Sequence, residues 1–262
     1  MIRALVLALS LAPPALAATQ DEVLQATVLP GWQAQDGSRM AALRLKLAPA
    51  WKTYWRAPGD AGIPPSFDWS GSENLGSVRY LWPRPVVFHT NGMQTIGYHD
   101  ELVLPLQITP RDPSQPVVLR GRVDLGICNE ICMPASLEVQ ARLEGAGAPD
   151  AAIRGALAAR PSTAREAGLS AIACSVSPSA NGLRITAQMA MPRLGGDETV
   201  VFEAGPDIWV DEAQTTRTGG HLVAEADMVA DSRAPFALDR SNLVVTVIAP
   251  DRAVEIRGCP AP

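Results

Sequence analysis

Two cysteines four positions apart, Cys128 and Cys132, are the residues of this chain best suited to chemistry. Two thiols at this spacing can close a small disulfide ring, open it again and pass two electrons to a partner by thiol–disulfide exchange. The chain contains only four cysteines, and the other two, Cys174 and Cys259, lie far away along the sequence. The spacing therefore predicts two separate pairs with different roles.

The segments on either side of the close pair predict an antiparallel hairpin. Residues 123–127 and 136–143 have the strand pattern, and the cysteines flank the turn between them. Facing positions across such a hairpin are close enough for a disulfide. A ring this small gains little loop entropy, which favours reversible chemistry over a stabilising role, although a plain hairpin disulfide remains the alternative. Pro134 lacks an N–H group and is expected to end the strand pairing beside the loop.

The charges near the pair predict thiols of low intrinsic reactivity. Glu130 lies inside the ring, and neither Lys nor Arg occurs within five residues of either cysteine. A nearby carboxylate should raise the pKa of a thiol. This pattern suits a passive electron carrier whose exchange reaction is completed inside a complex, and it differs from the C-x-x-C motif of thioredoxins.

The distant pair, Cys174 and Cys259, is predicted to form a structural disulfide. Cys174 lies in the first expected strand of a second domain, and Cys259 follows its last one. A bridge between them would close a loop of about 84 residues, for which the chain-entropy model gives on the order of 4–5 kcal/mol. A second redox pair is the alternative, but no local motif supports it.

The elements around these cysteines predict an all-β protein with two β-sandwich domains. The 23 prolines and 21 glycines fit strands and turns. Apolar and polar residues alternate in both halves, for example at 43–47, 136–143 and 183–189. We expect one domain over residues 18–143, a linker over 144–167 and a second domain over 168–262. Asp150 is expected to cap a short helix that runs to about Arg160 in the linker.

The N-terminus predicts export. Residues 1–17 have the features of a secretory signal peptide, namely an early arginine, the apolar run 4–11 and the cleavage pattern Ala15-Leu16-Ala17. The alternative is a membrane anchor, which this run is too short to form. No later segment offers 18 uninterrupted apolar residues. We therefore expect a soluble periplasmic protein, in a compartment where disulfides persist.

Several classes of function are disfavoured. The net charge of −5 and the absence of a basic cluster argue against nucleic-acid binding. Motifs for serine hydrolases, zinc proteases, phosphate loops and dinucleotide binding are not found, so no cofactor is expected. Five of the six tryptophans fall between positions 32 and 82. They could form a sugar-stacking platform, but core packing is the favoured interpretation.

Several short motifs resemble the N-terminal periplasmic domain of the thiol:disulfide interchange protein DsbD, in the branch associated with suppression of copper sensitivity. In family order they are Trp51-Lys-Thr-Tyr-Trp55-Arg56-Ala-Pro-Gly-Asp60, Phe67-Asp-Trp69, Trp82-Pro83, Gly97-Tyr98, Leu104-Pro105 and Ile127-Cys128-Asn-Glu-Ile-Cys132-Met-Pro134. The resemblance covers roughly residues 20–143. It implies an immunoglobulin-like sandwich with the redox cysteines at one end, so the expected fold is all-β with two immunoglobulin-like β-sandwich domains.

The resemblance also implies a shell of residues around the catalytic pair. A cap loop would fall at residues 88–93 and shield the sulfurs from unwanted partners. Its predicted members are Phe88, His89 and Met93, and the predicted neighbours of the pair are Tyr54, Trp55, Tyr98 and Glu130. By analogy with the family, Cys132 is the sulfur that faces partners. The spacing here is C-x3-C, whereas well-known members have C-x5-C.

The resemblance implies a redox carrier of the protein-disulfide reductase type. The family's membrane electron-transporting and thioredoxin-like domains are not found in this sequence. We therefore expect a membrane electron transporter and a thioredoxin-like protein on separate chains as the electron source. An oxidised periplasmic protein is the expected client.

Two other classes of function stay open. The first is a copper-binding or copper-tolerance module, in which the two cysteines act with His89, His99, Met93 and Met133, since sulfur and imidazole ligands suit Cu(I). No metal site is assigned. The second is an adhesive or scaffold sandwich in which both disulfides are structural.

Overall fold

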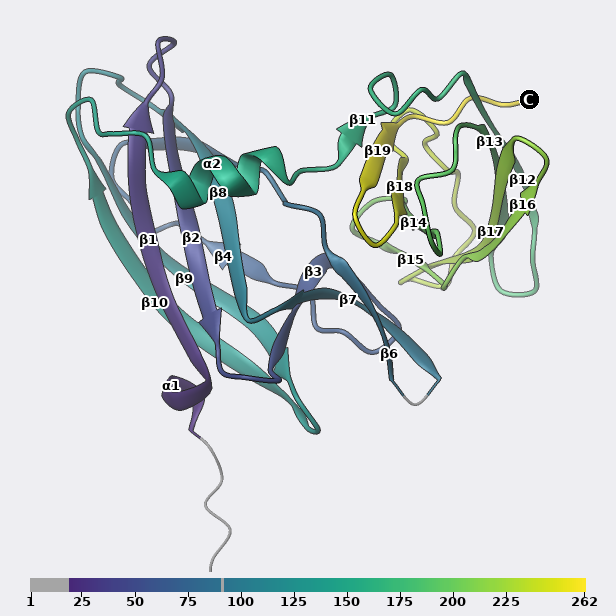
Figure 1. The fold of residues 1–262 in the computed structure, drawn as a ribbon, viewed down its shortest axis with the longest axis horizontal. Helices are drawn as coiled ribbons and strands as arrows, with labels where there is room; N and C mark the ends of the chain where they lie inside the picture. The colour runs from purple at the N-terminus through teal and green to yellow at the C-terminus, as the bar shows by residue number, and fades with distance from the viewer. Residues whose placement is uncertain (1–18, 91) are drawn as a thin grey trace, which may run out of the picture.

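The computed structural model describes residues 19–90 and 92–262, and Figure 1 shows two sheet-rich domains joined by a helical segment. It confirms the predicted all-β, immunoglobulin-like architecture with two domains. The predicted signal peptide at 1–17 lies outside the described residues. In the part of the chain that the structure describes, no helix is long and apolar enough to cross a membrane.

The N-terminal domain is a sandwich of two antiparallel sheets. One sheet has the order β1-β2-β8-β5, and the other has the order β10-β9-β3-β7-β6, with β4 paired to β9. After a short helix, α1 (Gln20–Val23), the strands are β1 (Leu24–Gln33), β2 (Arg39–Leu47), β3 (Lys52–Gly59), β4 (Ser66–Asp68), β5 (Leu75–Tyr80), β6 (Val86–Thr90), β7 (Met93–His99), β8 (Glu101–Pro110), β9 (Val117–Cys128) and β10 (Cys132–Leu143).

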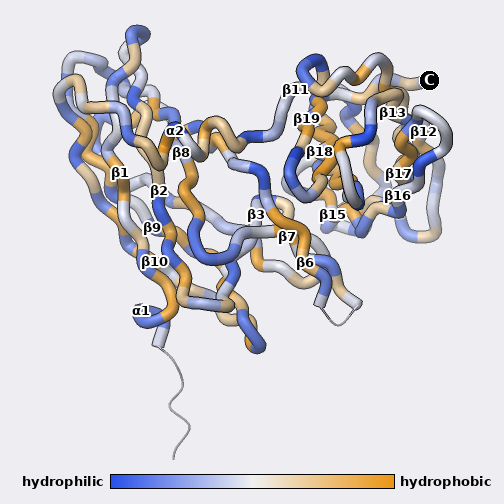
Figure 2. Tube along the Cα trace, in the orientation of Figure 1, coloured by the Kyte–Doolittle hydropathy of each residue, from blue (hydrophilic) through white to orange (hydrophobic). Residues whose placement is uncertain are grey.

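The alternating sequence pattern explains how the two sheets pack. In β2, Leu43 and Leu45 are buried, while Lys46 between Leu45 and Leu47 is exposed. These leucines join apolar residues of both sheets, among them Leu104 of β8 and Ile127 of β9, in one core. Figure 2 shows hydrophobic segments on strands of both sheets, among them β8 and β7. Burial of this alternate set fixes the register, because a shift of one residue would turn it to solvent.

The linker contains the expected helix. Helix α2 (Ala151–Ala158) begins after Asp150, whose carboxylate accepts hydrogen bonds from the backbone N–H groups of Ala152 and Ile153. This capping satisfies two of the donors that a helix start leaves unpaired. Ile153 is fully buried, which anchors the helix on the N-terminal domain.

The C-terminal domain is a second two-sheet sandwich. Its sheets have the orders β11-β19-β18-β14 and β12-β13-β17-β15, and β16 pairs with β17. The strands are β11 (Ser162–Thr163), β12 (Ala171–Pro178), β13 (Leu183–Ala190), β14 (Thr199–Glu203), β15 (Ile208–Val210), β16 (Gln214–Thr218), β17 (His221–Ala230), β18 (Val244–Ile248) and β19 (Ala253–Arg257). Cys174 in β12 is bonded to Cys259, which follows β19.

The two domains touch through both apolar and charged groups. Ile248 of β18 belongs to the core of the N-terminal domain, and Val201 of β14 packs against that core. Arg56 of β3 pairs with Glu203 of β14 at 2.7 Å and with Glu255 of β19 at 2.8 Å. These contacts hold the second domain against β3 and β7 of the first.

Candidate functional site

The Cys128–Cys132 disulfide closes the tip of the β9–β10 hairpin. Cys128 ends β9, Cys132 begins β10, and the two are direct partners in the ladder. Their α-carbons are 4.0 Å apart and the sulfurs are bonded. The backbone N–H of Asn129 donates to the carbonyl of Ile131 across the turn at 3.3 Å. The bond therefore lies at one end of the sandwich, where a partner can approach it.

The expectation that Pro134 ends the strand pairing is wrong. Pro134 lies within β10 opposite Gly126, and the ladder continues past it to Cys132 and Cys128. The reason is that β10 is an edge strand of its sheet. An edge strand tolerates proline where the missing N–H would have pointed away from the neighbouring strand. Pairing therefore extends to the cysteines themselves.

The two sulfur-bearing residues differ in exposure. Cys128 is only 5% exposed, on the face of β9 opposite the core residue Ile127, whereas Cys132 is exposed. Beside it at the hairpin tip, Ile131 is 77% exposed. A thiolate must reach the sulfur it attacks, so access is one determinant of exchange. Cys132 is the sulfur that a partner can reach.

Tyr54 of β3 supplies the polar neighbour of this reachable sulfur. Its Oη lies 3.2 Å from the Sγ of Cys132. Because a disulfide sulfur carries no hydrogen, the tyrosine O–H is the donor in this contact. Burial raises the pKa of Tyr54, so the hydroxyl keeps its proton at neutral pH. The same O–H can stabilise a thiolate at Cys132 when the disulfide is reduced.

Two glycines make room for the Tyr54 ring. A Cβ added at Gly126 would come within 2.9 Å of the ring, and one added at Gly62 would come within 2.8 Å. Real side chains do not approach so closely, so both positions need glycine for the ring to lie where it does. The Thr53 hydroxyl donates to the carbonyl of Gly126 at 2.9 Å. The strand before Cys128 is thereby fixed against β3.

A row of side chains crosses the sheet at the level of the disulfide. The cross-strand partners are, in order, His99, Lys52, Cys128 and Cys132. Partners in an antiparallel ladder project from the same face, so Lys52 shares its face with the sulfurs. The Lys52 ammonium contacts the Thr95 hydroxyl at 3.0 Å and lies 4.9 Å from the centre of the Phe88 ring. Burial lowers the pKa of Lys52.

Lys52 is a residue of the site that sequence reasoning missed. Lys52 is far from the cysteines along the chain, and it reaches this row only through the pairing of β3 with β9. The feature of the sequence that indicates Lys52 is its position in the Trp51–Asp60 motif, which also contains Tyr54.

The predicted cap residues lie on the β6–β7 hairpin. Phe88 is partly buried, with its ring centre 6.1 Å from that of His99, whereas His89 and Met93 are exposed. Asn91 lies outside the described residues. None of the hydrogen bonds found among the described residues joins this hairpin to either sulfur. Shielding of the disulfide by residues 88–93 stays a prediction.

The remaining predicted shell residues are Trp55 and Tyr98, which are buried, and Glu130, which is exposed. Trp55 is fully buried and packs in the core of the sandwich, on the face of β3 opposite Tyr54. Tyr98 is also buried, and its hydroxyl donates to the carbonyl of Pro83 at 2.8 Å. Burial holds the pKa of Tyr98 well above its usual range. Glu130 is exposed in the turn between the cysteines. The structure therefore brings Tyr54, and not Trp55, to the sulfur.

The arrangement gives the copper hypothesis no preformed ligand set. Among residues 19–90 and 92–262, no group of three or more His, Cys, Asp or Glu side chains is placed to hold a metal ion. Cys128 and Cys132 are bonded to each other, and so are Cys174 and Cys259. The geometry instead provides one reachable disulfide with a hydroxyl donor beside it.

Comparison with protein families matches residues 25–143 to the N-terminal domain of the thiol:disulfide interchange protein DsbD. Among solved structures, the N-terminal periplasmic domain of ScsB from Proteus mirabilis is similar over 94% of this chain and 96% of that chain, with a TM-score of 0.70 and 23% identity. The N-terminal domain of Neisseria meningitidis DsbD in the reduced form covers 48% of this chain and 86% of that chain, with a TM-score of 0.27 and 17% identity. Comparison with curated proteins found no match.

Proposed function

Residues 25–143 belong to the family of the N-terminal domain of the thiol:disulfide interchange protein DsbD, and we propose that this chain carries electrons to oxidised periplasmic proteins through Cys128 and Cys132. The family match and the disulfide support a thiol–disulfide exchange module. The observation that carries the proposal is the asymmetry of the pair, with one sulfur exposed beside a hydroxyl donor and the other buried.

Loading of the carrier begins with a dithiol donor of the thioredoxin-like class. A donor thiolate attacks the exposed Sγ of Cys132, the bond to Cys128 breaks, and Cys128 leaves as a thiolate. The second donor thiol then attacks the mixed disulfide and releases Cys132 as a thiolate. The donor is oxidised to a disulfide, and the carrier gains two electrons and, after protonation, two thiol hydrogens. A membrane electron transporter is the proposed source that reduces the donor again.

Unloading runs the same exchange steps in reverse order on a client protein. The Cys132 thiolate attacks the client's disulfide and forms a mixed disulfide, which Cys128 then resolves by attacking Cys132. The client leaves with two thiols, and the Cys128–Cys132 bond is restored. The Tyr54 hydroxyl, 3.2 Å from the Sγ of Cys132, stabilises the Cys132 thiolate that is released at the end of loading and attacks at the start of unloading.

Stopped-flow transfer from a reduced thioredoxin-like protein to the oxidised chain tests this function. We expect transfer faster than that given by a small dithiol of equal reducing power. Cys132→Ser should abolish transfer, whereas Cys128→Ser should leave one reachable thiol that traps the partner as a mixed disulfide. Transfer no faster than with the small dithiol would contradict the carrier function. Failure of Cys128→Ser to form a trap would contradict the role of Cys132.

A further inference from the structure

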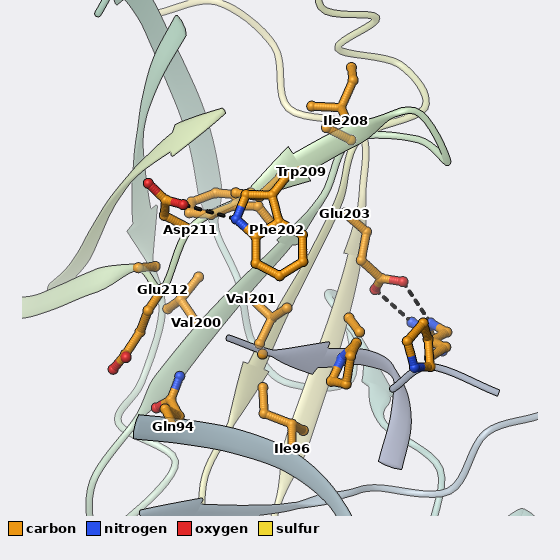
Figure 3. Close-up of a pocket in the computed structure, with 18 of the residues that line it drawn as sticks. Gln94, Ile96, Val200, Val201, Phe202, Glu203, Ile208, Trp209, Asp211 and Glu212 are labelled. Atoms are coloured by element: carbon orange, nitrogen blue, oxygen red, sulfur yellow. Dashed lines mark hydrogen bonds and ion pairs between the residues drawn. The ribbon is translucent and has the colours of Figure 1, made fainter. Parts of the chain in front are cut away.

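A cleft of about 420 Å³ lies between the two domains. Figure 3 shows Ile96 and Gln94 of β7 on one side, and Val200, Val201 and Trp209 of the C-terminal domain on the other. Most of the lining is apolar, and the Trp209 side chain is 46% exposed although it is among the largest apolar groups of the protein. An exposed aromatic beside an apolar hollow is typical of a binding surface.

The charged groups of this cleft that form no ion pair are acidic. The positive charge of Arg56 is already neutralised by Glu203 and Glu255. Asp211 and Glu212 line the cleft and are exposed, and among the described residues neither forms an ion pair. Burial and the carboxylate of Asp60 from the other domain raise the pKa of Glu212, although the nearby His89 opposes this. A cation between these neighbouring carboxylates would relieve their mutual repulsion.

One chain segment connects the cleft with the surroundings of the redox site. The segment that follows β3 carries Ile63, whose Cβ lies 2.7 Å from the place of a Cβ on Gly126, two residues before Cys128. The next residue, Pro64, lines the cleft. Ile131, Ile63 and Trp209 are three of the four exposed large apolar residues in the described part of the chain. Ile131 lies at the hairpin tip, Ile63 precedes Pro64 in the connecting segment, and Trp209 lines the cleft.

We propose that this cleft is the specificity site for the partner protein: it binds an extended segment that places an apolar side chain against Trp209 and a flanking Lys or Arg between Asp60, Asp211 and Glu212. The proposal rests on the carrier function above and names the chemistry of the partner. Because Ile63 and Pro64 connect the cleft with the β9–β10 hairpin, the C-terminal domain would select which thiol reaches the disulfide. Charge complementarity favours a basic segment over a neutral or acidic one.

Kinetics with two reductants test the proposal. Trp209→Ala should lower kcat/KM for reduction by a thioredoxin-like protein with a basic surface by about tenfold, the usual effect of losing an aromatic anchor. Glu212→Lys should lower it and weaken its dependence on salt. Neither change should alter the rate with a small dithiol. Asp197→Lys, a matched reversal of an exposed acidic residue that is not part of the cleft, should behave as the unchanged protein.

A peptide probe separates this proposal from the carrier function. The cysteine-free peptide Lys-Lys-Val-Phe-Val-Lys should bind by calorimetry to the unchanged protein, bind at least tenfold more weakly to Trp209→Ala, and compete with the protein donor but not with the dithiol. Its Glu-for-Lys counterpart should not bind. Equal binding of both peptides, or unchanged donor kinetics in Trp209→Ala and Glu212→Lys, would overturn the proposal. Absence of donor transfer in the unchanged protein would instead count against the carrier function, while peptide binding would still report on the cleft.

Discussion

The two disulfides of this protein lie in contrasting surroundings. Cys128 and Cys132 are four positions apart at a hairpin tip, and one of them is exposed. Cys174 and Cys259 are 85 positions apart, and both are buried in the core of the C-terminal domain. The N–H of Cys174 also donates to the carbonyl of Pro260 at 2.8 Å, which fixes the chain end beside the bond. These surroundings support the proposed division of roles, with exchange at the first disulfide and stabilisation at the second.

The largest expected difference between the two disulfides is in their effect on stability. In the chain-entropy model, removing the 174–259 bond by a double Cys→Ala change costs about 4.5 kcal/mol, and removing the 128–132 bond costs about 2 kcal/mol. Urea unfolding of both double variants against the unchanged protein measures these costs. Equal losses, or a larger loss from the 128–132 variant, would contradict the division of roles.

The next largest effect is expected from a substitution of Gly126, which leaves space for the Tyr54 ring. Gly126→Ala places a Cβ 2.9 Å from the Tyr54 ring and 2.7 Å from Ile63, and overpacking of this kind costs about 1–3 kcal/mol. Displacement of the ring should also slow exchange at Cys132. Unfolding and donor kinetics measure both effects. Gly155→Ala is the control, because its Cβ would meet nothing within 4 Å and alanine favours the helix. If Gly126→Ala changed neither the free energy of unfolding nor the donor kinetics, the ring would not need this space.

A smaller effect is expected from the hydroxyl beside Cys132. Tyr54→Phe removes the hydrogen bond to the sulfur, which is worth about 0.5–1.5 kcal/mol. We expect a raised thiol pKa at Cys132 and slower alkylation of the reduced protein at neutral pH. The pH profile of alkylation, followed by mass spectrometry at each cysteine, measures this. Tyr80→Phe, which removes a hydroxyl that accepts from the Trp69 ring N–H, should leave the profile unchanged. An unshifted profile in Tyr54→Phe would show that the hydroxyl does not stabilise the thiolate.

The smallest effect is a pH-dependent one between the domains. Burial and Asp60 raise the pKa of Glu212 in the folded protein. A carboxyl whose pKa is raised by folding costs stability where it is ionised, so the cost is present at neutral pH and disappears as the pH falls through the folded pKa to below the ordinary value. Glu212→Gln should therefore raise Tm at pH 7 and lose that advantage near pH 4. An equal gain at both pH values would assign the effect to packing.

The sequence predicted much of this structure because strands and motifs are local patterns. Alternation located β2, β10 and β13, and the motif around Cys128 identified the family. The features that it missed depend on residues that meet only in the folded chain. Lys52 joins the sulfur row through the β3–β9 register, and the pairing of Pro134 depends on β10 being at the edge of its sheet. The cleft arises where two domains meet, and no pattern within either domain predicts it.

The strand β3 has a consequence for how this protein can evolve. Tyr54 approaches the disulfide, and Arg56, two residues later, holds the C-terminal domain through Glu203 and Glu255. One short segment of β3 therefore contacts both the disulfide of its own domain and the C-terminal domain. Exchange of the second domain for another sandwich would leave Arg56 partly buried and unpaired unless the new domain supplied acidic residues at equivalent places. Across related chains, we expect positions 56, 203 and 255 to change together, and position 54 to change independently of them.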